Sequence, residues 1–168
     1  DPQFVPALVT AGTTLIQYAW VEGWTHHPRP LRDARKLLER ALELAPKDET
    51  AFEGLLRCEL FARRFEPAGD YLNDIKDDPA LDYTHALGRG LWFAMHENWK
   101  VAEDWFNRAV KAAGDDTRRA NALIELGLVL MRQGNLQLAD ARMGEGVLLA
   151  EPNRLRLHLW SKLKYERG

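Results

Sequence analysis

The sequence predicts an all-α solenoid of about four helical hairpins followed by a C-terminal capping helix. Two observations support this: a motif with helical spacing recurs at a nearly constant interval, and a second helical pattern precedes each copy. A chain of 168 residues can also bury roughly 70% of the surface that it exposes when unfolded. We therefore expect a single domain over residues 1–168, with repeats at about 3–45, 48–78, 80–114 and 117–151 and a capping helix at 153–166.

The recurring motif begins with a large apolar residue and has alanine three residues later. The alanines are Ala34, Ala68, Ala102 and Ala139, so the first two steps are 34 residues and the last is 37. Four residues after each alanine stands a large apolar side chain: Leu38, Leu72, Phe106 or Met143. This spacing places both positions on one helical face, with a small residue where another helix must approach closely.

A first helix precedes each copy of this motif. In ALIELGLVLMRQGN, apolar residues and a glycine stand at i, i+3, i+4 and i+7, namely Leu123, Leu126, Gly127 and Leu130. The segments FVPALVTAGTTLI, AFEGLLRCELF and ALGRGLWFAMHEN follow the same pattern. We expect nine helices, near residues 3–22, 31–45, 48–61, 65–77, 80–95, 99–113, 117–132, 136–150 and 154–166.

Together these features resemble the tetratricopeptide repeat (TPR) family. The Leu-Gly pair of the first helix, the short turn, the small-residue ladder of the second helix and Pro46 after ALELA all match, and the resemblance covers nearly the whole chain. It implies a right-handed superhelix whose first helices line a concave face. The chain departs from the family pattern at Leu56 and Arg89, and GDD at 114–116 lengthens one turn.

The stretch YAWVEGWTHHPRP inserts ten residues into the turn of the first hairpin. Its expected form is two additional helical turns that place Trp20 and Trp24 on one face and end at Gly23 and the prolines. The two tryptophans either pack over the end of the hairpin or form a secondary surface for a partner. An aromatic insertion at this place also resembles the TPR arrays of bacterial adenylate cyclases and winged-helix regulators.

The same insertion contains the only candidate metal ligands, Glu22, His26 and His27. Adjacent histidines point apart, and no spaced Cys or His pair completes a set of four ligands, so we expect no metal site. No phosphate-binding glycine loop and no nucleophile elbow is present, so we also expect no catalytic residue and no cofactor. The remaining histidines are isolated in the sequence; they are His85, His96 and His158.

Charge and cysteine content exclude further classes of function. With 23 basic and 25 acidic side chains, the chain has no electrostatic basis for binding nucleic acid or an anionic membrane. Its apolar runs are too short to span a bilayer. The single cysteine, Cys58, lies in the apolar run GLLRCELF, and we expect a buried free thiol rather than a reactive one. No signal peptide is recognisable, and a start at Asp1 is expected of a processed form or of a segment of a longer protein.

The resemblance also implies which residues line the concave face, since they belong to the first helix of each hairpin. They are Val9, Thr13, Ile16, Glu53, Arg57, Leu60, Leu87, Leu91, Met95, Ile124, Leu128 and Met131. Family members that clamp acidic carboxyl tails need Lys, Asn and Arg at such positions, so we expect no tail clamp. A mostly apolar face suits an amphipathic helix or an extended apolar segment, from another protein or from a second copy of the chain. Alternatively, some of these residues are core.

The predicted function is a non-catalytic scaffold for protein–protein interaction, as a regulatory module of a larger bacterial protein. The alternative is a small, free-standing TPR chaperone or assembly factor for secreted or envelope proteins. A third class, an enzyme, has little support in the sequence.

Overall fold

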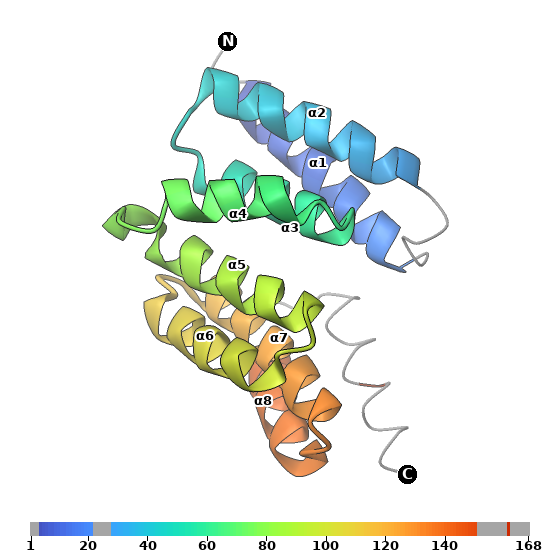
Figure 1. Ribbon diagram of the computed structural model, residues 1–168, viewed down its shortest axis with the longest axis vertical. Helices are drawn as coiled ribbons and strands as arrows, with labels where there is room; N and C mark the ends of the chain where they lie inside the picture. Colours follow the sequence, from blue (N-terminus) through green and yellow to red (C-terminus); the bar gives the residue numbers. More distant parts are fainter. Residues whose placement is uncertain (1–3, 22–27, 151–160, 162–168) are drawn as a thin grey trace. The chain divides into compact units, whose positions relative to one another are not determined.

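The computed structural model describes residues 4–21, 28–150 and Ser161, and within these residues it is helical without any strand (Figure 1). The elements are α1 (Phe4–Val21), α2 (Pro28–Leu44), α3 (Glu49–Phe61), α4 (Phe65–Asp74), the 3-10 helix η1 (Pro79–Leu81), α5 (Asp82–Met95), α6 (Trp99–Ala112), α7 (Asp116–Arg132) and α8 (Leu136–Leu149). The all-α fold class and the eight helices expected before residue 150 are confirmed. Apart from Ser161, the expected capping helix lies outside the described residues.

The helices form two compact units, Asp1–Lys76 with α1 to α4 and Asp77–Gly168 with α5 to α8. In the first unit, α1 pairs with α2, α3 packs against both, and α4 packs against α3. In the second unit, the hairpins α5–α6 and α7–α8 are joined by packing of α6 against α7. That all repeats form one continuous domain stays a prediction.

Two expected boundaries differ most, each by three residues: the end of α4, at Asp74 rather than residue 77, and the start of α2. This helix begins at Pro28, three residues before the expected position. Proline fits the first turn of a helix, because its missing N–H would have no partner there and its φ is already helical. The prolines expected to close the insertion therefore open the second helix instead.

The small-residue ladder is confirmed in both units. The four ladder alanines are fully buried, and Leu38, Leu72, Phe106 and Met143 are exposed by 1% or less. Three first-helix glycines provide the room for these large side chains, since a Cβ at each would lie 2.4 to 2.7 Å from the facing side chain. The pairs are Gly12 with Leu38, Gly90 with Phe106 and Gly127 with Met143.

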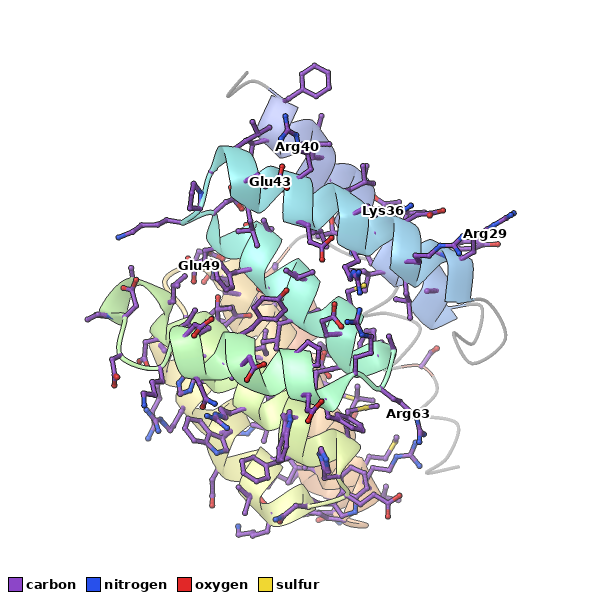
Figure 2. All side chains as sticks on the ribbon, turned by 45° about the horizontal axis from the view of Figure 1, so that its top comes forward. Arg29, Lys36, Arg40, Glu43, Glu49 and Arg63 are labelled. Carbon is purple, nitrogen blue, oxygen red and sulfur yellow. The ribbon has the colours of Figure 1, made fainter. Side chains whose placement is uncertain are left out.

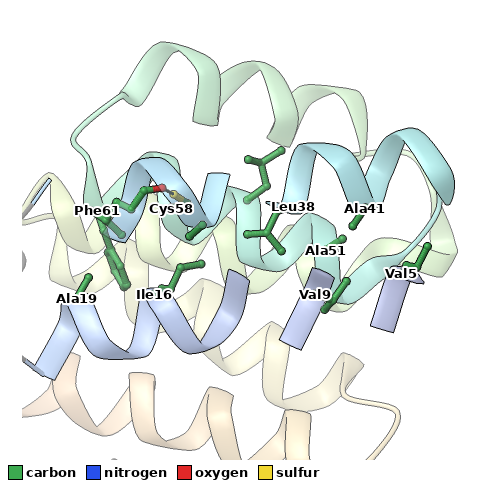
Figure 3. Close-up of a cluster of buried hydrophobic side chains, with 12 residues drawn as sticks. Val5, Val9, Ile16, Ala19, Leu38, Ala41, Ala51, Cys58 and Phe61 are labelled. Atoms are coloured by element: carbon green, nitrogen blue, oxygen red, sulfur yellow. Dashed lines mark hydrogen bonds between the residues drawn. The ribbon is translucent and has the colours of Figure 1, made fainter. Parts of the chain in front are cut away.

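The core of the first unit lies between α1, α2 and α3 (Figure 3). Val5, Val9 and Ile16 of α1 face small and branched residues of the two other helices, including Leu38 and Ala51. The four-residue spacing along α1 directs these side chains to one side of the helix. Within the described residues, no helix is both long and apolar enough to cross a membrane.

Candidate interaction surface

The apolar residues that sequence analysis assigned to the concave face of the first unit are buried. Val9 and Ile16 are 8% and 5% exposed and belong to the α1–α2–α3 core, and Leu60 of α3 is fully buried. These side chains offer almost no surface to a partner in this conformation.

The polar residues assigned to the same face keep part of their surface. Thr13 is half-buried, and its hydroxyl donates to the carbonyl oxygen of Val9 at 2.9 Å. On α3, Arg57 Nε donates to Glu53 Oε1 at 3.1 Å, and both side chains are less than one-fifth exposed. Among the residues assigned to the concave face, the first unit therefore exposes mainly the Glu53–Arg57 ion pair and Thr13 rather than apolar side chains.

The second unit divides its assigned residues in a similar way. Leu87, Leu91 and Ile124 are 0%, 6% and 4% exposed, whereas Met95, Leu128 and Met131 are half-buried. Met95 lies on α5 and the other two on α7, and these two first helices contact each other. Among the assigned residues of these two helices, the accessible apolar surface therefore comes from two methionines and a leucine. Partner binding through any of the twelve assigned residues stays a prediction.

The insertion cannot be compared with its prediction in full. Helix α1 continues to Val21, but the side chain of Trp20 and all of Trp24 lie outside the described residues. The same holds for the candidate metal ligands Glu22, His26 and His27. Among the residues that the structure describes, no group of three or more His, Cys, Asp or Glu side chains is placed to hold a metal ion.

A buried carboxylate that the sequence analysis did not single out lies on α3. Glu59 is 2% exposed and occupies the repeat position held by Leu15, Phe93 and Leu130 in the other first helices. This break in an otherwise apolar position was the signal in the sequence that could have found it.

The charge of Glu59 is compensated by two arginines. Arg64 Nε lies 3.2 Å from Glu59 Oε2, and Arg35 Nη1 lies 3.8 Å from Oε1. Burial raises the pKa of Glu59, Arg35 opposes that shift, and the nearby Glu39 adds to it. The first unit thus contains a buried acid that is held between partly exposed cations.

Next to this acid, Cys58 is buried, as expected. Its thiol donates to the carbonyl oxygen of Leu31 at 2.9 Å. Burial, reinforced by the charge of Glu59, raises the pKa of Cys58 to about 12. Since the thiolate is the reactive form, this thiol has the character of a core residue.

Two of the three isolated histidines pack against tryptophans of the second unit. His85 is 8% exposed and meets Trp105 edge to face at 5.4 Å between ring centroids. Burial lowers the pKa of His85, and the nearby Arg89 and Arg108 lower it further. His96 stacks on Trp92 with centroids 4.0 Å apart. His158 lies outside the described residues.

Comparison with known proteins finds solved structures of similar fold. One of them is TTC0263, a thermophilic TPR protein of Thermus thermophilus, which superposes with a TM-score of 0.57 over 95% of this chain and 83% of that protein, at 17% sequence identity. The chain has a TPR-like fold. The TPR resemblance read from the sequence is thereby confirmed at the level of the fold. No protein-family model and no curated protein sequence matches the chain.

Proposed function

We propose that this TPR-like chain is a non-catalytic scaffold that binds a helix or an extended segment of a partner protein. Helical-hairpin solenoids present extended surfaces built from successive first helices. The buried titratable groups Glu59, Cys58 and His85 contact neighbouring side chains or backbone, which supports structural roles for them.

The observation that carries the proposal is the half-buried apolar strip Met95, Leu128 and Met131 on α5 and α7. Apolar side chains that keep some exposure on adjacent helices provide contact area for the apolar face of a partner helix. Methionine is unbranched and polarisable, so it adapts to the shape of the bound segment. Leu91 and Leu87 beneath or beside the strip are too deeply buried to contribute contacts.

In the first unit, the Glu53–Arg57 ion pair and Thr13 are the accessible residues among those assigned to the face. Their side chains suit hydrogen bonds to a polar or backbone group of the partner. We propose that these side chains contact a polar or backbone group of a partner within the first unit.

The test compares capture of partners from a lysate by the wild-type chain and by a Leu128→Glu, Met131→Glu double variant. Both positions are half-buried, so the charges change the strip without being placed in the core. Leu138→Glu, at a residue that is 37% exposed on α8, is the matched control for an added surface charge. All variants are first compared by circular dichroism to establish that they are folded.

The captured protein is then divided into synthetic peptides, which are titrated against each variant by calorimetry. We expect one peptide to bind the wild type and the Leu138→Glu variant equally, and to lose at least about tenfold in affinity with the double variant. Equal binding to the double variant would exclude the strip as the site. The identity of the peptide also distinguishes a regulatory scaffold from a chaperone of exported proteins.

A further inference from the structure

Helix α1 has an uncharged outer face. Phe4, Ala7, Ala11, Thr14 and Tyr18, which we call the α1 stripe, follow one another at spacings of three and four residues and therefore share one side of the helix. All five are exposed, with Phe4 at 62% and Tyr18 at 54%. No Asp, Glu, Lys or Arg occurs anywhere in the 18 residues of α1. A helix on the surface of a globular protein ordinarily carries charged or polar residues on its outer side, so an uncharged outer face that exposes two aromatic rings is unusual.

The contrast with α2 is direct, because both helices belong to the same hairpin. The exposed side of α2 carries charged residues, among them Arg29, Lys36 and Arg40 (Figure 2). Charge on the outer face is what a solvated helix of a globular protein ordinarily shows. Composition therefore separates a solvated α2 from an α1 that is suited to an apolar neighbour.

Of the two hydroxyl-bearing residues in the stripe, Thr14 and Tyr18, the first needs no external partner. The hydroxyl of Thr14 donates to the carbonyl oxygen of Thr10 in the preceding turn at 2.7 Å. Covering the stripe with another apolar surface would therefore leave no unsatisfied hydrogen-bonding group on this side chain.

In two of the other three repeats, this side of the first helix is buried. When Gly12 is aligned with Leu56 of α3 and Gly127 of α7, the three central stripe residues correspond to Ala51, Leu55 and Cys58 and to Ala122, Leu126 and Val129. All six are 3% exposed or less.

In both repeats the first helix packs against the second helix of the preceding hairpin: α3 packs against α2, and α7 packs against α6. Cys58 donates to Leu31 on α2. Gln133, which corresponds to Tyr18, donates to the carbonyl oxygen of Trp99 on α6 at 3.1 Å. The corresponding face of α1 is exposed along the whole α1 stripe.

The stripe is complementary to a second copy of itself. Ala11 is its midpoint, with Phe4 and Tyr18 seven residues away on either side. If two α1 helices cross antiparallel on a two-fold axis at Ala11, each Phe4 meets Tyr18 of the second copy, and the alanines allow close approach at the centre. Antiparallel helices also bring opposite ends of their dipoles together, and no like charges face each other along the stripe. We propose that the α1 stripe is the interface of a symmetric homodimer.

The available area fits a weak but specific dimer. Aromatic side chains bury about 200 Å² each, so at the observed exposures of 62% and 54% the four rings of a dimer would contribute about 450 Å². The alanines and Thr14 along α1, which is about 27 Å long at 1.5 Å per residue, would add to this area, but the total stays below the roughly 1,200 to 2,000 Å² of a standard interface. We therefore expect a dissociation constant in the micromolar range.

The test is sedimentation velocity of the full chain at about 5 to 200 µM, a range that brackets such a constant. Ala11→Glu and Ala11→Lys each place two like charges at the two-fold axis, and we expect both variants to be monomers. Their equimolar mixture should recover the dimer, because unlike charges then meet at the axis. Gln17→Glu, also on the exposed side of α1 but off the stripe, should remain dimeric.

Four results would overturn the proposal. A wild-type monomer over the whole concentration range would mean that no second copy binds. A dimer that Ala11→Glu leaves intact would place the interface elsewhere. If the two Ala11 variants do not recover a dimer when mixed, or if the wild type grows into larger species, the contact is not symmetric about Ala11. Circular dichroism of each variant separates loss of the dimer from loss of the fold.

Discussion

Substitution of Gly90 by alanine tests the close packing of Phe106 against Gly90 between the two helices of the α5–α6 hairpin. A Cβ at position 90 would lie 2.6, 2.7 and 2.9 Å from three ring atoms of Phe106, which is 1% exposed. Carbon atoms in good contact are separated by about 3.5 to 4.0 Å, so the ring or the helix must move by nearly 1 Å. Overpacking of this kind costs about 1–3 kcal/mol.

Part of this cost is offset, because alanine is favoured over glycine in a helix by about 1 kcal/mol. We therefore expect Gly90→Ala to lower the free energy of unfolding by up to about 2 kcal/mol, the difference between these two effects. Gly69→Ala is the control, since Gly69 lies within α4 and nothing would lie within 4 Å of its Cβ. It shares the helical gain without the clash, so it should raise the free energy of unfolding by up to about 1 kcal/mol.

The measurement is urea denaturation of both variants, together with Phe106→Leu and the Gly90→Ala, Phe106→Leu double variant. The double-mutant cycle should show that Gly90→Ala costs less when the ring is absent. If Gly90→Ala stabilises the chain as much as Gly69→Ala does, the close approach of α5 and α6 is not the reason why glycine occupies position 90.

Three further predictions concern the first unit. Asp48 accepts a hydrogen bond from the backbone N–H of Ala51 at 2.8 Å, so Asp48→Ala should cost about 1 kcal/mol in thermal or urea unfolding. Asn98→Ala should cost little, because the Asn98 side chain makes no capping bond. Equal losses for the two variants would contradict this prediction. The raised pKa of Glu59 means that the native state binds its proton more tightly than the unfolded state. The stability due to this group is therefore largest below the ordinary carboxyl pKa and is lost as the pH rises through the raised value. The unfolding free energy of wild type relative to Glu59→Gln should decrease as the pH rises above the ordinary carboxyl pKa of about 4, and a constant difference would be inconsistent with a buried carboxylate. Cys58, with its pKa raised to about 12, should react with a thiol reagent at neutral pH only after unfolding in denaturant, and rapid labelling of the native chain would show that the thiol is accessible.

The sequence by itself determined the repeat, the eight helices expected before residue 150 and the residues that hold each hairpin together. These features follow from local spacing, since a three- and four-residue period fixes which side chains share a face. The ladder alanines and the large residues after them needed nothing from distant parts of the chain to be recognised as buried. The prolines at the start of α2 were expected to close the insertion, but they begin the helix. Proline is compatible with the end of one helix and with the first turn of the next, and only the path of the backbone distinguishes the two.

The tertiary structure alone decided how much surface each first-helix residue keeps. Spacing assigned Leu60, Leu87 and Leu128 to the same face, yet the first two are fully buried and the third is half-buried. Periodicity orients a side chain relative to its own helix, but burial depends on every helix packed around it. The same reason explains Glu59, whose acidic side chain stands at an apolar repeat position and is compensated by Arg64 and Arg35. Such compensation arises between helices and leaves no periodic signal in the sequence.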